Sequence, residues 1–309
     1  MNLTKTLCAG LLLGGIFSAN SQNVASTNLL TSGGLDAGTV EKENAFYGYQ
    51  AGRFTENAYN SFFGHLAGAK NVSGDSNSFF GHQAGINNGE GSSNTFIGAS
   101  AGSYNYDGRH NVYVGYASGA SNQGNTNTFI GAYSGAKATG EGNVLIGSYA
   151  GYGETDSNKL HINNAYNVTP LIWGDFSKYL IKLNGKVGIG NDFGAFPIFA
   201  GGLDISHYRL IVKGGILTEE VRINLQADWA DYVFSDSYKL KSLEEVEKYI
   251  EDNGHLPNVP SAKQVKEEGI ELGEITKIQQ EKIEELTLYL IQQNKEIQEL
   301  KEMVKNLKQ

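Results

Sequence analysis

Seven copies of one short motif lie between residues 44 and 157, and their even spacing constrains the fold more than any other feature. Each copy reads Asn, any residue, an aromatic or apolar residue, any residue and Gly, followed three residues later by Ala-Gly or Ser-Gly. The copies begin at Asn44, Asn60, Asn77, Asn94, Asn111, Asn127 and Asn143, in steps of 16 or 17 residues. A fixed period of this length indicates repeats that stack on their neighbours.

The period predicts a mainly β fold, in which residues 44–157 form a β-roll or β-solenoid of seven coils. A strand of five residues is about 17 Å long, so one period holds two short strands and two turns. The Ala-Gly or Ser-Gly pair supplies a corner, because Gly tolerates positive φ. The motif asparagines are expected to hydrogen-bond in the turn and to form a ladder between coils. The residues expected to stack in the interior are Phe46, Phe62, Phe79, Phe96, Tyr113, Phe129 and Leu145.

The composition favours a folded repeat over a flexible linker rich in Gly, Asn and Ser. The chain of 309 residues contains 40 Gly but also 17 Tyr and 14 Phe, and disordered chains are poor in aromatic residues. The net charge of −9 argues against a nucleic-acid partner. Gly188 and Gly190 lack the third glycine and the following helix of a dinucleotide site. No cofactor or metal is therefore expected.

The first 21 residues read as a secretory signal peptide. Lys5 supplies the positive charge, Leu7–Phe17 is the apolar segment, and Ala19–Ser21 is a small-residue site with cleavage expected after Ser21. The apolar segment is too short to cross a bilayer, and no other stretch is longer. Cys8 is the sole cysteine and lies in this segment. The chain is therefore expected to be exported to the cell surface or beyond, without a membrane span or disulfides, and to begin with a linker over 22–43.

A change of composition separates the repeat from the C-terminal third of the chain. Residues 158–228 are expected to form a connector of short strands bounded by glycines. Residues 229–271 read as a helical capping region. In it, Ser242 and Glu245 form a capping-box pattern for a helix over Leu243–Glu251. Ser261 is expected to begin a short helix that ends near Gly269.

A heptad pattern predicts a coiled-coil helix over residues 272–309. The a and d positions are Ile283, Leu286, Leu290, Gln293, Ile297, Leu300, Val304 and Leu307, of which seven are apolar. Gln293 is a polar layer that can set the register. Glu296 and Lys301 are spaced for an ion pair between parallel chains.

Apolar residues beside the heptad positions, Leu288, Tyr289 and Ile291, favour more than two strands. Alternatively they pack against the helix at 243–251 of the same chain. The remaining alternative is a helical hairpin within one chain. The terminal place of the helix and the short helices before it favour assembly between chains.

The repeat resembles the heads of trimeric autotransporter adhesins through Asn94–Gly102 and Asn127–Gly135. This resemblance implies a parallel β-roll in a homotrimer. The present coil departs from that family because it is longer and places an aromatic residue inside.

The C-terminal part is similar to tail-fibre-type proteins of Bacteroidetes. The matching stretches are Gly185–Gly190, Tyr208–Gly215, Trp229–Phe234, His255–Ser261, Leu272–Glu274 and Lys282–Tyr289. Ser235–Lys241 also resembles the endosialidase-type intramolecular chaperone, whose members are peptidase S74-like. That resemblance implies trimer folding and self-cleavage at Ser235, activated by Lys239 or Lys241. The alternative is that Ser235 begins a turn and both lysines are solvated. The spacing here differs from the chaperone pattern.

Some side chains of the repeat are candidates for binding. His65 and His82 occupy the same repeat position and form either a weak metal site or a surface ladder. Tyr104, Tyr106 and Tyr133 are candidates for stacking on sugars.

Together these features predict a non-enzymatic structural or adhesive fibre. Its expected partners are further copies of itself and surface glycans or proteins. One alternative is a phage-derived tail fibre with a C-terminal chaperone that self-cleaves. The other is a polysaccharide lyase, for which the sequence has no catalytic cluster.

Overall fold

The computed structural model describes residues 24–26, 30–40, 42–166, 169–190, 196–200, 203–224 and 229–307. The predicted signal peptide lies outside these residues. The chain divides into two compact units, Met1–Gly185 and Lys186–Gln309.

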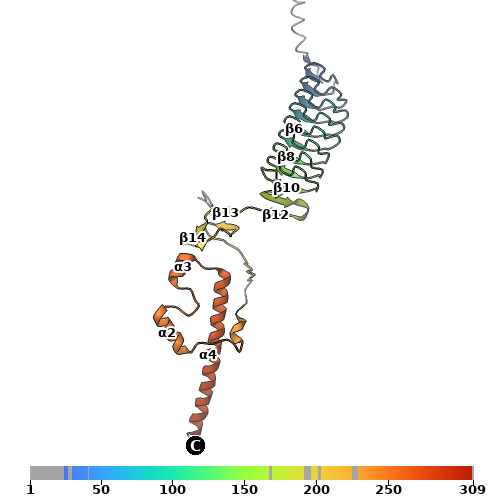
Figure 1. The fold of residues 1–309 in the computed structure, drawn as a ribbon. Coiled ribbons are helices and arrows are strands. Elements are labelled where there is room, and N and C mark those ends of the chain that lie inside the picture. The colour runs from blue at the N-terminus through green and yellow to red at the C-terminus, as the bar shows by residue number, and fades with distance from the viewer. Residues whose placement is uncertain are drawn as a thin grey trace, which may run out of the picture. The chain divides into compact units, whose positions relative to one another are not determined.

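The first unit is a β-solenoid, whose coils are stacked along one axis (Figure 1). Each coil contributes one short strand to a parallel sheet. The parallel strands are β2 (Leu30–Gly33), β3 (Asn44–Tyr47), β4 (Ser61–Phe63), β5 (Ser78–Phe80), β6 (Thr95–Ile97), β7 (Val112–Val114), β8 (Thr128–Ile130), β9 (Val144–Ile146) and β10 (Lys159–Ile162). The sheet is extended by antiparallel strands at both ends: β1 (Val24–Ser26), β11 (Ile172–Asp175) and β12 (Leu180–Leu183). The 3-10 helix η1 (Phe176–Lys178) joins β11 to β12.

The solenoid has about eight turns, compared with the seven predicted. The additional strands are β2, in the segment expected to be a linker, and β10, in the segment expected to be a connector. Neither strand begins with the Asn motif. A parallel ladder needs only backbone groups and an inward side chain that fits, and in β2 the buried Ser32 lies opposite Phe46.

The interior of the solenoid is a single stack of aromatic rings, as the repeat predicts. The aromatic residue of each motif is fully buried and lies opposite its equivalent in the next coil. Ring centroids are 5.2 Å apart for Phe46 and Phe62 and 4.7 Å apart for Phe79 and Phe96. No single coil covers its own ring, so each coil depends on its neighbours for burial. The repetitive β-solenoid is therefore confirmed.

The second unit contains two small strand pairs and three α-helices. Strand β13 (Val187–Ile189) is parallel to β16 (Leu210–Val212), and β14 (Phe199–Ala200) is antiparallel to β15 (Leu203–Asp204). After them come η2 (Ala230–Phe234), α2 (Leu243–Asn253), α3 (Ala262–Glu268) and α4 (Leu272–Asn306). No helix among the described residues is long and apolar enough to cross a membrane.

The capping box expected at Ser242 is present, and Ser261, which was expected only to begin a helix, forms a second one. The Ser242 hydroxyl accepts a hydrogen bond from the Glu245 amide at the start of α2, and Ser261 does the same for Gln264 at the start of α3. Gly269 follows the last residue of α3, where the sequence places the helix end.

Candidate functional site

The motif asparagines connect consecutive coils through both ends of their side chains. The amide oxygen of Asn77 accepts a hydrogen bond from the backbone N–H of Asn94 at 2.9 Å, and its amide nitrogen donates to the carbonyl of Gly91 at 2.8 Å. The other motif asparagines repeat this pattern. All seven are buried. A buried amide needs such partners, so the ladder holds coils in register.

A second polar column, eleven residues after the motif asparagine, runs through the same interior. Its asparagines are Asn71, Asn88, Asn105 and Asn122. Asn88 donates to the amide oxygen of Asn71 at 2.7 Å, and Asn105 donates to that of Asn88 at 2.9 Å. Sequence reasoning missed this column, although its spacing of 17 residues was visible.

The aromatic stack and the second asparagine column both end in ionisable residues at the last turn of the solenoid. Glu154 takes the place that the asparagines hold in the second column. His161, opposite Leu145 in the sheet, takes the place that the rings hold in the aromatic stack. The imidazole Nε2 of His161 lies 3.0 Å from Oε2 of Glu154, with only 12% and 15% of their side chains exposed. At this end the interior therefore holds a carboxylate beside an imidazole, where the earlier coils hold asparagine amides and aromatic rings.

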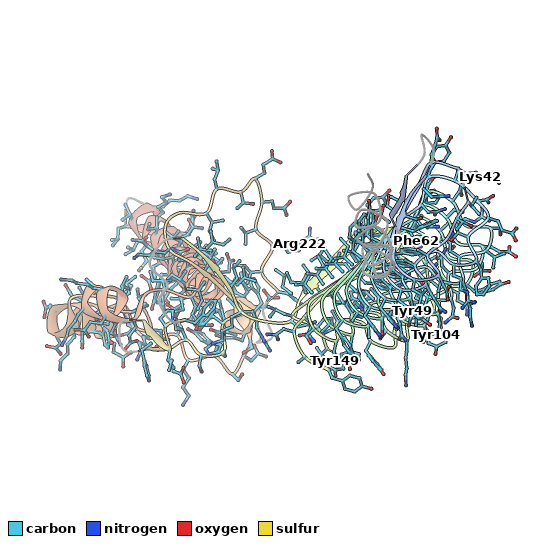
Figure 2. The ribbon with its side chains drawn as sticks, turned by 90° about the horizontal axis from the view of Figure 1, so that it is seen from above. Lys42, Tyr49, Phe62, Tyr104, Tyr149 and Arg222 are labelled. Atoms are coloured by element: carbon cyan, nitrogen blue, oxygen red, sulfur yellow. The ribbon has the colours of Figure 1, made fainter. Side chains whose placement is uncertain are left out.

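A cavity of about 580 Å³ opens over Glu154 and His161. It is lined by Tyr149, Gly151, Tyr152, Gly153, Glu154, His161 and Tyr166, and we call it the tyrosine cleft. The ring of Tyr166 is nearly perpendicular to that of Tyr149, at 89° and a centroid distance of 5.7 Å. Figure 2 shows Tyr149 projecting outward from the solenoid, whereas Phe62 lies in its interior.

The Glu154 carboxylate is held in its charged form. Its interaction with the His161 imidazole is the largest effect and lowers the pKa of Glu154 below the ordinary value, while partial burial opposes it. Oxygen Oε1 also accepts a hydrogen bond from the backbone N–H of Asp156 at 2.8 Å. A carboxylate carries more lone pairs than these contacts use, so it can accept further hydrogen bonds from a ligand.

A row of tyrosines leads along the solenoid to the tyrosine cleft. Tyr133, one of the predicted sugar-stacking residues, lies 5.1 Å from Tyr116 and 4.8 Å from Tyr149 between ring centroids. A hydrogen bond with Tyr116 raises the pKa of Tyr133. The other two candidates, Tyr104 and Tyr106, are exposed but do not line the cleft.

The two predicted histidines form a surface column. The rings of His65 and His82 stack at 5.0 Å, and Tyr49 stacks on His65 at 5.1 Å. Within the described part of the chain, no three His, Cys, Asp or Glu residues gather as a metal site would require.

The structure does not bring Ser235 together with the lysines proposed to activate it. The Ser235 hydroxyl lies 3.0 Å from that of Ser237 at the end of η2. Lys239 and Lys241 instead line a separate pocket between α2 and α4. Among the described residues, no hydrogen bond joins Ser235 to either lysine.

Helix α4 uses one face for contacts within its own chain. The Glu281 carboxylate accepts hydrogen bonds from the hydroxyl of Tyr232 and from Asn258, the latter at 3.2 Å. Glu285 accepts one from Tyr238. Between these carboxylates lies Lys282, 2.8 Å from each. Hydrogen bonding to Glu281 raises the pKa of Tyr232 to about 12.

The predicted heptad residues lie on the opposite face of α4 and are open to solvent. With Ile283 at position a, Glu284 and Glu285 take positions b and c, and Glu281 takes position f of the preceding heptad. In contrast, Ile283, Leu286 and Leu290 are 55%, 58% and 64% exposed. Leu300, Val304 and Leu307 are exposed as well, as is the polar Gln293.

No protein-family model, curated protein or solved structure matches this chain. The resemblances to autotransporter heads, tail fibres and the intramolecular chaperone therefore stay predictions.

Proposed function

We propose that the protein is an exported structural and adhesive fibre component. In this proposal α4 joins several copies of the chain in parallel, and the solenoid presents a repetitive surface. No chemical reaction is assigned to the chain. The exposed apolar face of α4 is the observation that supports the proposal most.

The division of α4 into two faces supports assembly between chains. Contacts with Tyr232, Tyr238 and Asn258 use the b, c and f side, which points away from the partner helices in a coiled coil. The a and d side carries large apolar residues that are exposed in the single chain, and of these Leu286 also lines the pocket between α2 and α4. An exposed apolar stripe of this kind, interrupted only at Gln293, marks an interaction surface. The intrachain packing thus leaves the a and d positions from Leu290 onwards open to other copies.

Three chains are proposed for the assembly, on the strength of the repeat's resemblance to trimeric heads. The a positions Ile283, Ile297 and Val304, with Leu at most d positions, instead form a pattern found in two-stranded coils. Light scattering of the full chain separates these cases, because it measures the mass of the assembly. A trimer is expected, and a monomer would overturn the fibre proposal.

A point variant tests whether the a and d positions of α4, which form the seam of the proposed coiled coil, cause the chains to assemble. Leu300→Asp places a charge at a d position and is expected to yield monomers. Gln298→Asp places the same charge at a b position, outside the seam, and is expected to leave the assembly intact. Equal effects of both variants would contradict the proposed use of the heptad face.

A further inference from the structure

We propose that the tyrosine cleft is a binding site for a neutral oligosaccharide, with the sugar held by Tyr166, Tyr149 and Glu154. This inference rests on the adhesive part of the proposed function and names the partner class. It is argued from three features: an available aromatic face, a mixture of hydrogen-bonding groups, and a row of rings that continues the site.

The available aromatic face belongs to Tyr166. Most rings of the solenoid stack on the ring of the next coil and so cover one another's faces. Tyr166 is turned 89° from Tyr149 and 68° from Tyr152, and 71% of it is exposed. An amphipathic aromatic ring of this kind can contact the C–H face of a pyranose while its hydroxyl group stays hydrated.

The hydrogen-bonding groups of the cleft suit hydroxyl groups, which both donate and accept. Glu154 accepts in its charged form, and charge-assisted hydrogen bonds are the stronger kind. The tyrosine hydroxyls can donate and accept. This mixture of a few polar groups in an otherwise apolar cavity is typical of small-molecule sites, and the volume of about 580 Å³ lies in their usual range.

Charged ligands fit the cleft less well. The amine of Lys137 already lies 5.5 Å from the ring centroid of Tyr152, at the place where a ligand cation would sit. Tyr149, Tyr152 and Tyr166 also pack on one another, with centroids 5.2 to 5.8 Å apart, and so do not surround a gap of a cation's size. An anionic sugar would meet the Glu154 carboxylate. These contacts favour a neutral ligand.

The row of tyrosines favours a chain of sugars over a single one. Tyr116, Tyr133 and Tyr149 follow one another at centroid spacings of 5.1 and 4.8 Å and lead into the cleft. Their edges and hydroxyls form a surface along which further sugar units can lie. A ligand of several units is therefore expected to bind more tightly than its monosaccharide.

The test is an array of neutral glucan, mannan, galactan and xylan oligosaccharides, screened with the full chain and followed by calorimetry with each that binds. At least one is expected to bind. Tyr166→Ala should weaken that binding at least tenfold, whereas Tyr166→Phe, which keeps the ring, should retain most of it. Glu154→Gln should weaken it several-fold. Tyr49→Ala removes an exposed tyrosine that stacks on His65 and does not line the cleft, and it should have no effect.

Three results would overturn the assignment of the tyrosine cleft. One is the absence of binding to every oligosaccharide by a chain whose circular dichroism shows it folded. Another is binding that survives Tyr166→Ala combined with Tyr149→Ala. The third is binding abolished by Tyr104→Ala and not by the cleft variants. The fibre proposal and the tyrosine cleft can be tested independently. A monomeric chain that binds sugar through Tyr166 would contradict the proposed assembly but support the proposed binding site.

Discussion

Thr126 holds a left-handed backbone conformation, with φ at 58°, just before the motif asparagine Asn127. The same conformation occurs at Tyr59, Ser76, Ser93 and His110, each directly before its own motif asparagine. Left-handed backbone is unfavourable for residues with a Cβ, most of all for β-branched ones. The solenoid therefore retains local strain at a fixed place in each coil, which the neighbouring coils stabilise.

Relief of this strain should make the protein more stable. Thr126→Asn is expected to raise the free energy of unfolding by about 0.5–1 kcal/mol, because Asn adopts the left-handed region more readily. Urea denaturation followed by circular dichroism measures the change. Thr139→Asn is the matched control, since Thr139 is also exposed but does not have positive φ. An equal gain from both variants would contradict the explanation.

Gly98 shows the opposite restriction, because a side chain at this position has no room. Its φ is +132°, and an added Cβ would lie 2.5 Å from the carbonyl oxygen of Gly115. Gly98→Ala is expected to destabilise the solenoid by about 3 kcal/mol or more through strain and overlap. Gly153→Ala, at a position where an added Cβ meets nothing within 4 Å, is expected to change the stability by less than about 1 kcal/mol. Thermal unfolding of the two variants makes the comparison.

Asp175 should make the C-terminal end of the solenoid sensitive to acid. A hydrogen bond from Ser177, followed by the ion pair with Lys159 at 3.1 Å, lowers the pKa of the buried Asp175 carboxyl to about 2. The pKa of an unfolded Asp is about 3.9. Its stabilising contribution is thus complete above that value and is lost as the pH falls towards 2. Unfolding midpoints at pH 2 to 5 should decline for the native chain but stay flatter for Asp175→Asn.

The two asparagine columns stabilise the solenoid in addition to the sheet. Their side-chain hydrogen bonds join the same consecutive coils that the backbone hydrogen bonds of the sheet join. Asn88→Ala would remove bonds to the amide oxygen of Asn71 and to the carbonyl of Gly91, and would leave Asn105 without its acceptor. Loss of buried partners of this kind costs about 2–4 kcal/mol. Asn87→Ala is the control, since Asn87 is only half-buried and donates to the carbonyl of Ser103 alone. Chemical denaturation should show a much smaller loss for the control.

The motif asparagines and their aromatic residues were sufficient to predict the coils, because each period of 16 or 17 residues corresponds to one coil stacked on the next. The caps of α2 and α3 were predictable for a local reason, since Ser242 and Ser261 act within their own first turn. Strand β2 was not foreseen, and β10 was expected only as a strand of the connector, outside the solenoid. Both strands join the parallel sheet through backbone hydrogen bonds, which do not require the side chains of the motif.

The candidate site was predicted only in part. Tyr133 was predicted as a ring that stacks on sugars, but its neighbour Tyr149 lies 16 residues away in the sequence and reaches it only through the stacking of coils. Glu154 and His161 carry a subtler signal. At the last turn Glu154 stands where the repeat has Asn, and His161 stands where it has an aromatic or apolar residue. The site can therefore be recognised only by aligning this turn with the earlier coils, because it has no motif of its own.

The two units of the molecule differ in how much of their apolar surface is buried within a single chain. The solenoid has its own aromatic core, whereas the second half of α4 is exposed along its length in a single chain. We therefore expect two separate transitions in calorimetry. The helical transition should rise in temperature with protein concentration, because association stabilises it, and Leu300→Asp should remove that dependence. A single transition, at a temperature that does not change with protein concentration, would contradict this expectation.

The ladder bonds run only from one coil to the next, and this makes the length of the solenoid adjustable. A chain without residues 77–93 would join Ser76 to Asn94, and Asn60 would then receive the bond from Asn94 that it now receives from Asn77. Every column would remain continuous, and the rod would shorten by about 4.8 Å, the spacing of one strand. Unequal recombination between repeats can thus lengthen or shorten the reach of this protein in steps of one coil, while both ends keep their structure.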